Sequence, residues 1–182
     1  ADLLILEVGL GGRYDATNVI DKPARCVITP VDFDHKAFLG SDIRKIAGEK
    51  AGIIRPGCPV LSAIQRKVCD EVITAEAEKQ GAPLYKLRAH YIDAMPDDLA
   101  LIGEHQRANA ALAAMAMQLF GNSTRVPEAA IFEGARTASW PARMQRLKDG
   151  PLTALVPGVE VWLDGGHNPH AARAIARHLK RQ

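Results

Sequence analysis

The stretch "LLILEVGLGG", residues 3–12, combines an unbroken apolar run, one carboxylate and three glycines. Such a run is typical of a parallel strand whose two faces are both covered by helices. Residues 3–6 are therefore predicted to form a buried strand, with Glu7 at its carboxyl end. Open α/β sheets bind ligands at the carboxyl ends of their strands, so Glu7 is a candidate site residue.

Strand-like and helical patterns alternate through the following residues. Strands are predicted at residues 26–29, 58–64 and 82–87, with helices at 41–50 and 67–80 between them. This alternation favours an α/β fold with a mostly parallel sheet flanked by helices.

The second half of the chain predicts an Ala-rich helix at residues 106–120 and another helix starting at Pro127. A loop rich in proline and glycine follows, and residues 159–164 then begin a new strand, turn and helix. We place a domain boundary in this loop, which divides the chain into residues 1–149 and 150–182.

Composition excludes several classes of protein. The chain has 182 residues, 47% of them hydrophobic, and its 23 basic and 21 acidic side chains give a net charge of +2. Nothing in this balance favours binding to nucleic acid or to an anionic membrane, and no apolar run is long enough to span a bilayer. Cys26, Cys58 and Cys69 lack metal-site or disulfide spacing, which suits a reducing cytoplasm.

The three glycines suggest a dinucleotide-binding turn, but the rest of that motif is missing. Tyr14 stands where the third glycine of G-x-G-x-x-G is needed, and the residues after it are a poor start for a helix. We therefore interpret the glycines as a loop whose backbone passes close to a ligand.

A second carboxylate-rich stretch, "DFDH", follows the strand predicted at 26–29. Glu7 and His35, from the ends of adjacent strands, could share a divalent cation with phosphate oxygens. The alternative is that Glu7 caps a local turn and His35 is an ordinary loop histidine. Spacing alone does not decide between these interpretations.

Lys50 stands out on the helix predicted at 41–50, for which Ser41 is the expected N-cap. Ile43, Ile46 and Lys50 follow the spacing of one helix face, so the ammonium group lies on the apolar side. A buried lysine with a lowered pKa can react with carbon dioxide to give a carbamate. In the simpler interpretation, Lys50 complements the carboxyl end of the helix.

Six motifs together resemble the folylpolyglutamate synthase/dihydrofolate synthase family of the Mur-ligase superfamily. In order they are EVGLGGRYDATN, DFDHKAFLG, IAGEKAGI, GEHQRANAALA, WPARMQRL and LDGGHNPHAA. The resemblance implies a Mur-ligase central ATPase-type domain, followed by the first strand–helix unit of a C-terminal Rossmann-like domain that binds glutamate.

The resemblance implies roles for individual residues. The family's Mg²⁺ ligands match Glu7 and His35, and its carbamylated lysine matches Lys50. The pterin-contacting positions are Tyr14, Asp15 and Ala16, and the ATP-binding positions are Asn109, Arg143 and Asp164. His167 is expected near the phosphates or the glutamate, with a catalytic role. Without the resemblance, Asn109 could simply open a helix, Arg143 could form a surface ion pair and Asp164 could be a turn residue.

The implied reaction joins L-glutamate to dihydropteroate or folate, with ATP as the second substrate and an acyl phosphate as intermediate. The residues do not separate the two activities of the family, and a monomer is expected. Ala142 and Gly166 replace the usual glycine and alanine of the family motifs. A G-x-x-G-K-[ST] phosphate loop is not found, so we expect the chain to be part of a longer protein. A non-catalytic fragment and a metal-dependent phosphohydrolase are the alternatives.

Overall fold

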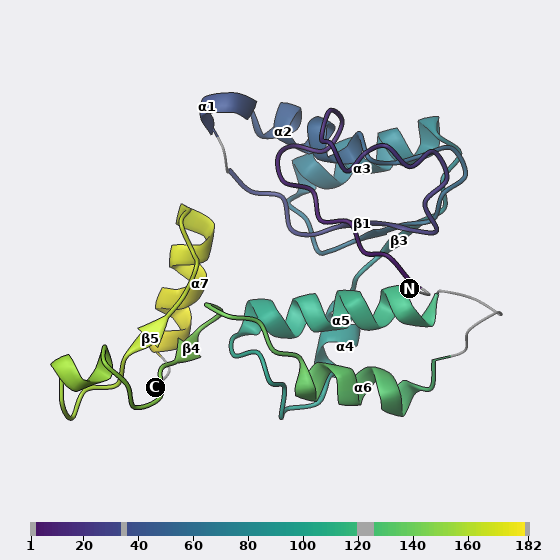
Figure 1. The fold of residues 1–182 in the computed structure, drawn as a ribbon. Coiled ribbons are helices and arrows are strands. Elements are labelled where there is room, and N and C mark those ends of the chain that lie inside the picture. The colour runs from purple at the N-terminus through teal and green to yellow at the C-terminus, as the bar shows by residue number, and fades with distance from the viewer. Residues whose placement is uncertain (1–2, 34–35, 120–125, 181–182) are drawn as a thin grey trace.

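A computed structural model describes residues 3–33, 36–119 and 126–180 (Figure 1). Strands β1 (Cys26–Ile28), β2 (Val60–Ser62) and β3 (Leu84–Lys86) pair in parallel in the order β1-β2-β3. The register places Val27 beside Leu61. These strands confirm the three predicted after residue 25, and the fold is α/β as expected.

One face of this sheet is covered by α2 (Ile43–Ala51) and α3 (Lys67–Lys79), which lie together above it in Figure 1. Side chains alternate along a strand, and Val60 turns its side chain to this face. It packs in one core with Ile46 of α2 and Ile73 of α3, all of them fully buried. Both helices therefore form where the apolar periodicity predicts them.

The opposite face of the sheet is covered by α5 (Glu104–Gln118), with α4 (Ala89–Asp93) and α6 (Glu128–Thr137) packed against it. Leu61, next to Val60 on β2, turns to this side and lies in a second core with Met115. The central strand is thus buried on both faces, as a parallel sheet between two helical layers requires.

Helix ends agree with the sequence only in part. The predicted N-cap Ser41 is wrong, because the Asp42 side chain accepts the hydrogen bond from the Arg44 backbone N–H at 2.9 Å. Asp and Ser are comparably good N-cap residues, so the sequence alone does not show which of these two neighbours caps α2. Gly81 follows the C-cap Gln80 with φ of 56°, which confirms the end predicted for α3.

The strand predicted at residues 3–6 is not found. This segment has no ladder partner among the described residues, and Ile5 is 83% exposed. An apolar run becomes a buried strand only where a neighbouring strand takes up its backbone hydrogen bonds and helices cover it. Within the residues described here, β1 pairs with β2 alone, and neither condition is met for residues 3–6.

The C-terminal part contains β4 (Gln145–Arg146), the 3₁₀ turn η1 (Thr153–Leu155), β5 (Trp162–Leu163) and α7 (Pro169–Leu179). The strands β4 and β5 are antiparallel, and their ladder joins residues on both sides of the domain boundary predicted at 149/150. Asn168 caps α7, because its Oδ1 accepts from the Ala171 N–H at 2.9 Å.

Two further expectations concern the chain as a whole. The three cysteines are free thiols in the structure, and the Sγ atoms of Cys26 and Cys58 lie 3.6 Å apart. Burial raises the pKa of the Cys26 thiol to about 12, which keeps it protonated and unreactive. Within the described part of the chain, no helix is long and apolar enough to cross a membrane.

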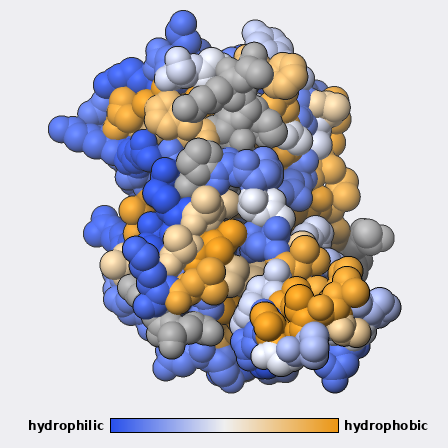
Figure 2. Space-filling model, turned by 90° about the vertical axis from the view of Figure 1, so that its left-hand side faces the viewer, coloured by the Kyte–Doolittle hydropathy of each residue, from blue (hydrophilic) through white to orange (hydrophobic). Residues whose placement is uncertain are grey.

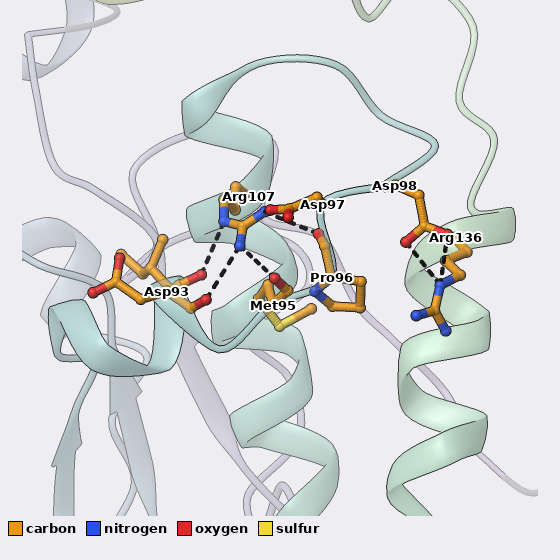
Figure 3. A network of polar contacts seen from close by, with 8 residues as sticks. Asp93, Met95, Pro96, Asp97, Asp98, Arg107 and Arg136 are labelled. Atoms are coloured by element: carbon orange, nitrogen blue, oxygen red, sulfur yellow. Dashed lines mark hydrogen bonds and ion pairs between the residues drawn. The ribbon is translucent and has the colours of Figure 1, made fainter.

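Arg107 holds the connection between α4 and α5 in place (Figure 3). Its guanidinium donates hydrogen bonds to four backbone carbonyls and one carboxylate, those of Ile92, Asp93, Met95, Pro96 and Asp97. The first of these carbonyls belong to the last turn of α4, where carbonyl groups lack partners within the helix. One side chain thus supplies donors both to the last turn of α4 and to the start of the irregular connection that follows it.

Replacing Arg107 with Ala is expected to lower the free energy of unfolding by about 2–4 kcal/mol, because several partly buried carbonyls lose a charged donor. Arg136→Ala is the matched control, since Arg136 forms an ion pair with the exposed carboxylate of Asp98. The control should cost about 0–1 kcal/mol. Urea unfolding followed by circular dichroism measures both, and equal losses would contradict this account of Arg107.

Candidate active-site loops

The glycine loop (residues 9–18) lies against the carboxyl end of α2. A Cβ placed on Gly12 would come within 2.8 Å of the Glu49 carbonyl oxygen and 3.3 Å of the Lys50 Cα. A Cβ on Gly52 would meet the Arg13 Cβ at 2.5 Å. In the structure the backbone of this loop therefore passes close to α2, and the approach to a ligand stays a prediction.

Asp15 organises the glycine loop through four hydrogen bonds. Its Oδ2 accepts from the Gly9 and Leu10 N–H groups at 3.0 and 2.9 Å. Its Oδ1 accepts from the Thr17 backbone N–H at 2.9 Å and from the Thr17 hydroxyl at 2.6 Å. The Thr17 hydroxyl and these N–H donors lower the pKa of Asp15 to about 2.

Asn18 and Arg55 join the end of the loop to the segment after α2. The Asn18 Nδ2 donates to the Arg13 carbonyl at 2.9 Å and to the Gly52 carbonyl at 3.3 Å. Arg55 donates in turn to the Asn18 carbonyl at 2.7 Å and to its Oδ1 at 2.9 Å. Sequence reasoning missed this clamp, because partners 37 residues apart leave no periodic signal.

Lys50 lies in the last turn of α2, directly beneath the glycine loop. Its neighbours Ala47 and Ala51 are buried, whereas Lys50 itself is half-buried. No hydrogen bond or ion pair joins its ammonium to any residue that the structure describes. The apolar face predicted for α2 is present, and Lys50 stands at its edge.

The predicted metal pair can be followed only in part. Glu7 is exposed and stands on the irregular segment before Gly9, not at the end of a buried strand. His35 lies outside the described residues. Among the residues with described positions, no three His, Cys, Asp or Glu side chains come together as a metal site.

Arg143 and Asp164 lie beside the β4–β5 ladder, and the Nδ1 of His167 lies 3.2 Å from the Gly165 carbonyl oxygen. The Asp164 Oδ2 accepts from the Met144 N–H at 2.8 Å, and its Oδ1 accepts from the Gly166 N–H at 2.7 Å. The Gly165 N–H also donates to the Ala142 carbonyl at 2.8 Å. Asp164 thus ties two connections together, and the exposed guanidinium of Arg143 extends from the same junction.

Asn109 is exposed on the first half of α5, where its Nδ2 lies 3.3 Å from the Gln106 Oε1. His105, one turn earlier on α5, lines a small cavity together with Ala174 and Arg177 of α7. The first turn of α5, one turn before Asn109, therefore faces the C-terminal helix.

No family model matches the chain. Dihydrofolate synthase/folylpolyglutamate synthase of Bacillus subtilis is 35% identical to it over 203 residues, which cover 100% of this chain and 45% of the relative. Human mitochondrial folylpolyglutamate synthase is 34% identical over 206 residues, or 98% of this chain and 34% of the relative. The chain therefore spans less than half the length of these relatives.

Solved structures show the same likeness. A folylpolyglutamate synthase in complex with AMPPCP and folate superposes with a TM-score of 0.81 at 28% identity, covering 97% of this chain and 46% of that one. The Mycobacterium tuberculosis folylpolyglutamate synthase complexed with ADP and AMPPCP gives a TM-score of 0.76 at 33% identity, with coverages of 95% and 42%. The arrangement of sheet and helices described above is shared with both.

Asp15 should make the stability of the protein depend on pH. Its pKa falls from 3.8 to about 2 on folding, so its contribution is present above pH 3.8 and is lost as the pH falls towards 2. The difference in unfolding free energy between the parent protein and the Asp15→Asn variant should therefore shrink as the pH is lowered from 6 to 3. Urea titrations at several pH values measure this difference, and a gap that does not change would contradict the prediction.

Ala142 adopts φ of 56°, a left-handed conformation that favours glycine. Ala142→Gly should therefore raise the free energy of unfolding by about 0.5–1 kcal/mol, after allowance for the greater freedom of glycine in the unfolded chain. Ala130→Gly in α6 is a control of opposite sign and should lower it by up to about 1 kcal/mol. Urea unfolding compares the two variants. If both were less stable than the parent protein, the backbone of Ala142 would not be strained in the way proposed.

Proposed function

Because the chain belongs to the folylpolyglutamate synthase/dihydrofolate synthase family, we propose that the protein containing it is an ATP-dependent amide ligase. It would join L-glutamate to dihydropteroate or to a folate. The observation that carries this proposal is a likeness that runs through the whole chain, at 35% identity over 100% of its residues. Solved relatives bound to AMPPCP and folate, and to DHPP and ADP, support these classes of substrate.

The proposed reaction proceeds in two steps. A carboxylate oxygen of the pteroate or folate attacks the γ-phosphorus of ATP, and ADP leaves as an acyl phosphate forms. The amine of L-glutamate then attacks the acyl carbon, loses a proton and displaces inorganic phosphate as the amide forms. The protein has to align several anions that repel each other, so positioning and cationic groups should dominate catalysis.

Three residues are proposed to bind ATP. The Arg143 guanidinium is exposed and offers a planar set of donors that suits phosphate oxygens. Asp164 holds the connection behind Arg143, and Asn109 offers the donor and the acceptor that an adenine edge requires. We place His167 beside this group, near the transferred phosphate. The junction between residues 1–149 and 150–182 would then form one side of the nucleotide site.

The glycine loop is proposed to bind the pterin. Both Asp15 oxygens already accept hydrogen bonds from the loop itself, so its main role would be to shape the loop. Tyr14 is 87% exposed and could place its ring against a flat heterocycle. Ala16 follows Asp15 and would leave room for the ligand beside it.

Lys50 is proposed to react with carbon dioxide, which would convert its amine into a carbamate and release a proton. A half-buried ammonium without a described partner suits such a change of charge. Mg²⁺ would neutralise phosphate oxygens when bound. The described residues supply only Glu7 of the predicted ligand pair, so no step of the proposal relies on the ion.

The alternatives have less support. A metal-dependent phosphohydrolase is the first of them, and the relatives that match the whole chain are instead named dihydrofolate synthase/folylpolyglutamate synthase and folylpolyglutamate synthase. The 182 residues taken alone could still be a non-catalytic fragment, because the curated relatives are more than twice as long. The activity therefore has to be tested on the intact protein, and its measured mass would show what accompanies this chain.

Lys50→Ala in the intact protein is expected to lower amide formation by at least about 100-fold, because the proposed carbamate cannot form. Lys45→Ala is the matched control, since Lys45 is exposed on the same helix. Both variants are assayed with ATP, L-glutamate and either dihydropteroate or folate, with release of phosphate and formation of the amide measured together. Normal turnover by Lys50→Ala would exclude the carbamate but not the ligase.

The ligase proposal has its own test in the same assay. Amide formation by the parent protein must require both ATP and L-glutamate. Phosphate release without amide formation would favour hydrolysis instead.

A further inference from the structure

A hollow of about 260 Å³ lies where the carboxyl ends of β1 and β2 face α7. We call it the arginine hollow, because Arg66, Arg173 and Arg177 line it together with Asp32 and Gln65. The face of the molecule that carries α7 is shown in Figure 2, where hydrophilic residues lie between apolar ones above and below. The residues that line it do not include Arg143, Asp164 or Asn109, which are proposed to bind ATP.

Asp32 joins the two sides of the arginine hollow. Its side chain is only 9% exposed; its Oδ2 accepts a hydrogen bond from Arg173 at 2.9 Å, and its Oδ1 forms an ion pair with the Arg66 guanidinium at 2.9 Å. Arg66 also lies over the Phe33 ring, with 5.8 Å between the guanidinium carbon and the ring centroid. These contacts fix the direction of two arginine side chains that remain about half exposed.

Gln65 stabilises the wall of the hollow, because its side-chain amide both accepts and donates a hydrogen bond. The Gln65 Oε1 accepts from the Val31 N–H at 2.9 Å, and its Nε2 donates to the Thr29 carbonyl at 3.0 Å. The loops that follow β1 and β2 are thereby fastened to each other. A wall fixed in this way can hold charged side chains in a constant geometry.

The described residues that line the arginine hollow carry more positive than negative charge. Among the described residues that line it, three carry a guanidinium group and one, Asp32, carries a carboxylate. Arg177 follows Arg173 by four residues on α7, so both reach the hollow from one side of that helix. Guanidinium groups bind carboxylates and phosphates through paired hydrogen bonds, and anions are the ligands that relieve such an excess.

We propose that the arginine hollow is a binding site for an oxyanion, either a carboxylate or a phosphate. Its place at the carboxyl ends of two parallel strands is where open α/β sheets bind ligands. Arg177 and the outer N–H groups of Arg66 would contact the anion, and Asp32 would position Arg66 and Arg173. The inference extends the proposed function, because L-glutamate brings carboxylates and ATP brings phosphates.

The test measures binding of two probes to the intact protein without nucleotide, at constant ionic strength. Isothermal titration calorimetry follows inorganic phosphate in one series and L-glutamate in the other. Arg177→Gln should weaken binding of the preferred probe about tenfold or more while leaving both Asp32 ion pairs in place. Arg66→Gln should weaken it as well. Arg44→Gln, which removes an exposed arginine paired with Glu71, should change affinity less than twofold.

The outcomes separate the sources of the anion. Weaker binding of L-glutamate alone assigns the hollow to a carboxylate of the amino acid, and weaker binding of phosphate alone assigns it to a phosphate group. Affinities for both probes that the Arg177 and Arg66 variants leave unchanged would overturn the proposal, as would a parent protein that binds neither. A parent protein that binds a probe in the hollow but forms no amide would refute only the ligase.

Discussion

The glycine loop and the carboxyl end of α2 can touch only because Gly12 and Gly52 carry no side chains. A Cβ at either position would lie 2.8 Å or less from an atom of the other segment. This contact brings the loop that carries Tyr14 next to the turn that carries Lys50. The proposed pterin site and the proposed carbamate therefore depend on the same close packing, and the Asn18–Arg55 clamp keeps it in place.

Periodicity predicts the elements around this contact because their partners lie within the chain. The apolar positions of α2 and α3 meet the apolar side chains of β1 and β2, so pattern and burial agree. Residues 3–6 carry an equally clear pattern but have no described strand beside them, and their side chains are exposed. A hydrophobic pattern states what a segment can bury, whereas the tertiary structure decides whether a partner is present.

The candidate site also contains residues that the sequence predicts and contacts that only the structure shows. Arg143 and Asp164 were found through the family resemblance, and the structure adds the backbone hydrogen bonds by which Asp164 ties their two segments together. Asp15 was also found through the family resemblance, as a pterin-contacting position, but its four donors all come from its own loop. The Arg55 clamp left no trace in the sequence, because a hydrogen bond between distant loops has neither period nor motif.

The arginines differ in how much of their hydrogen-bonding capacity the fold already uses. Arg107 donates its N–H groups to carbonyls before α5, and Arg55 donates to Asn18. Arg66 and Arg173 share one buried carboxylate and keep half of their surface exposed. Arg143 and Arg177 are exposed beside two different junctions of the chain. With a net charge of only +2, general attraction of anions is weak, so recognition would depend on these local groups of arginines.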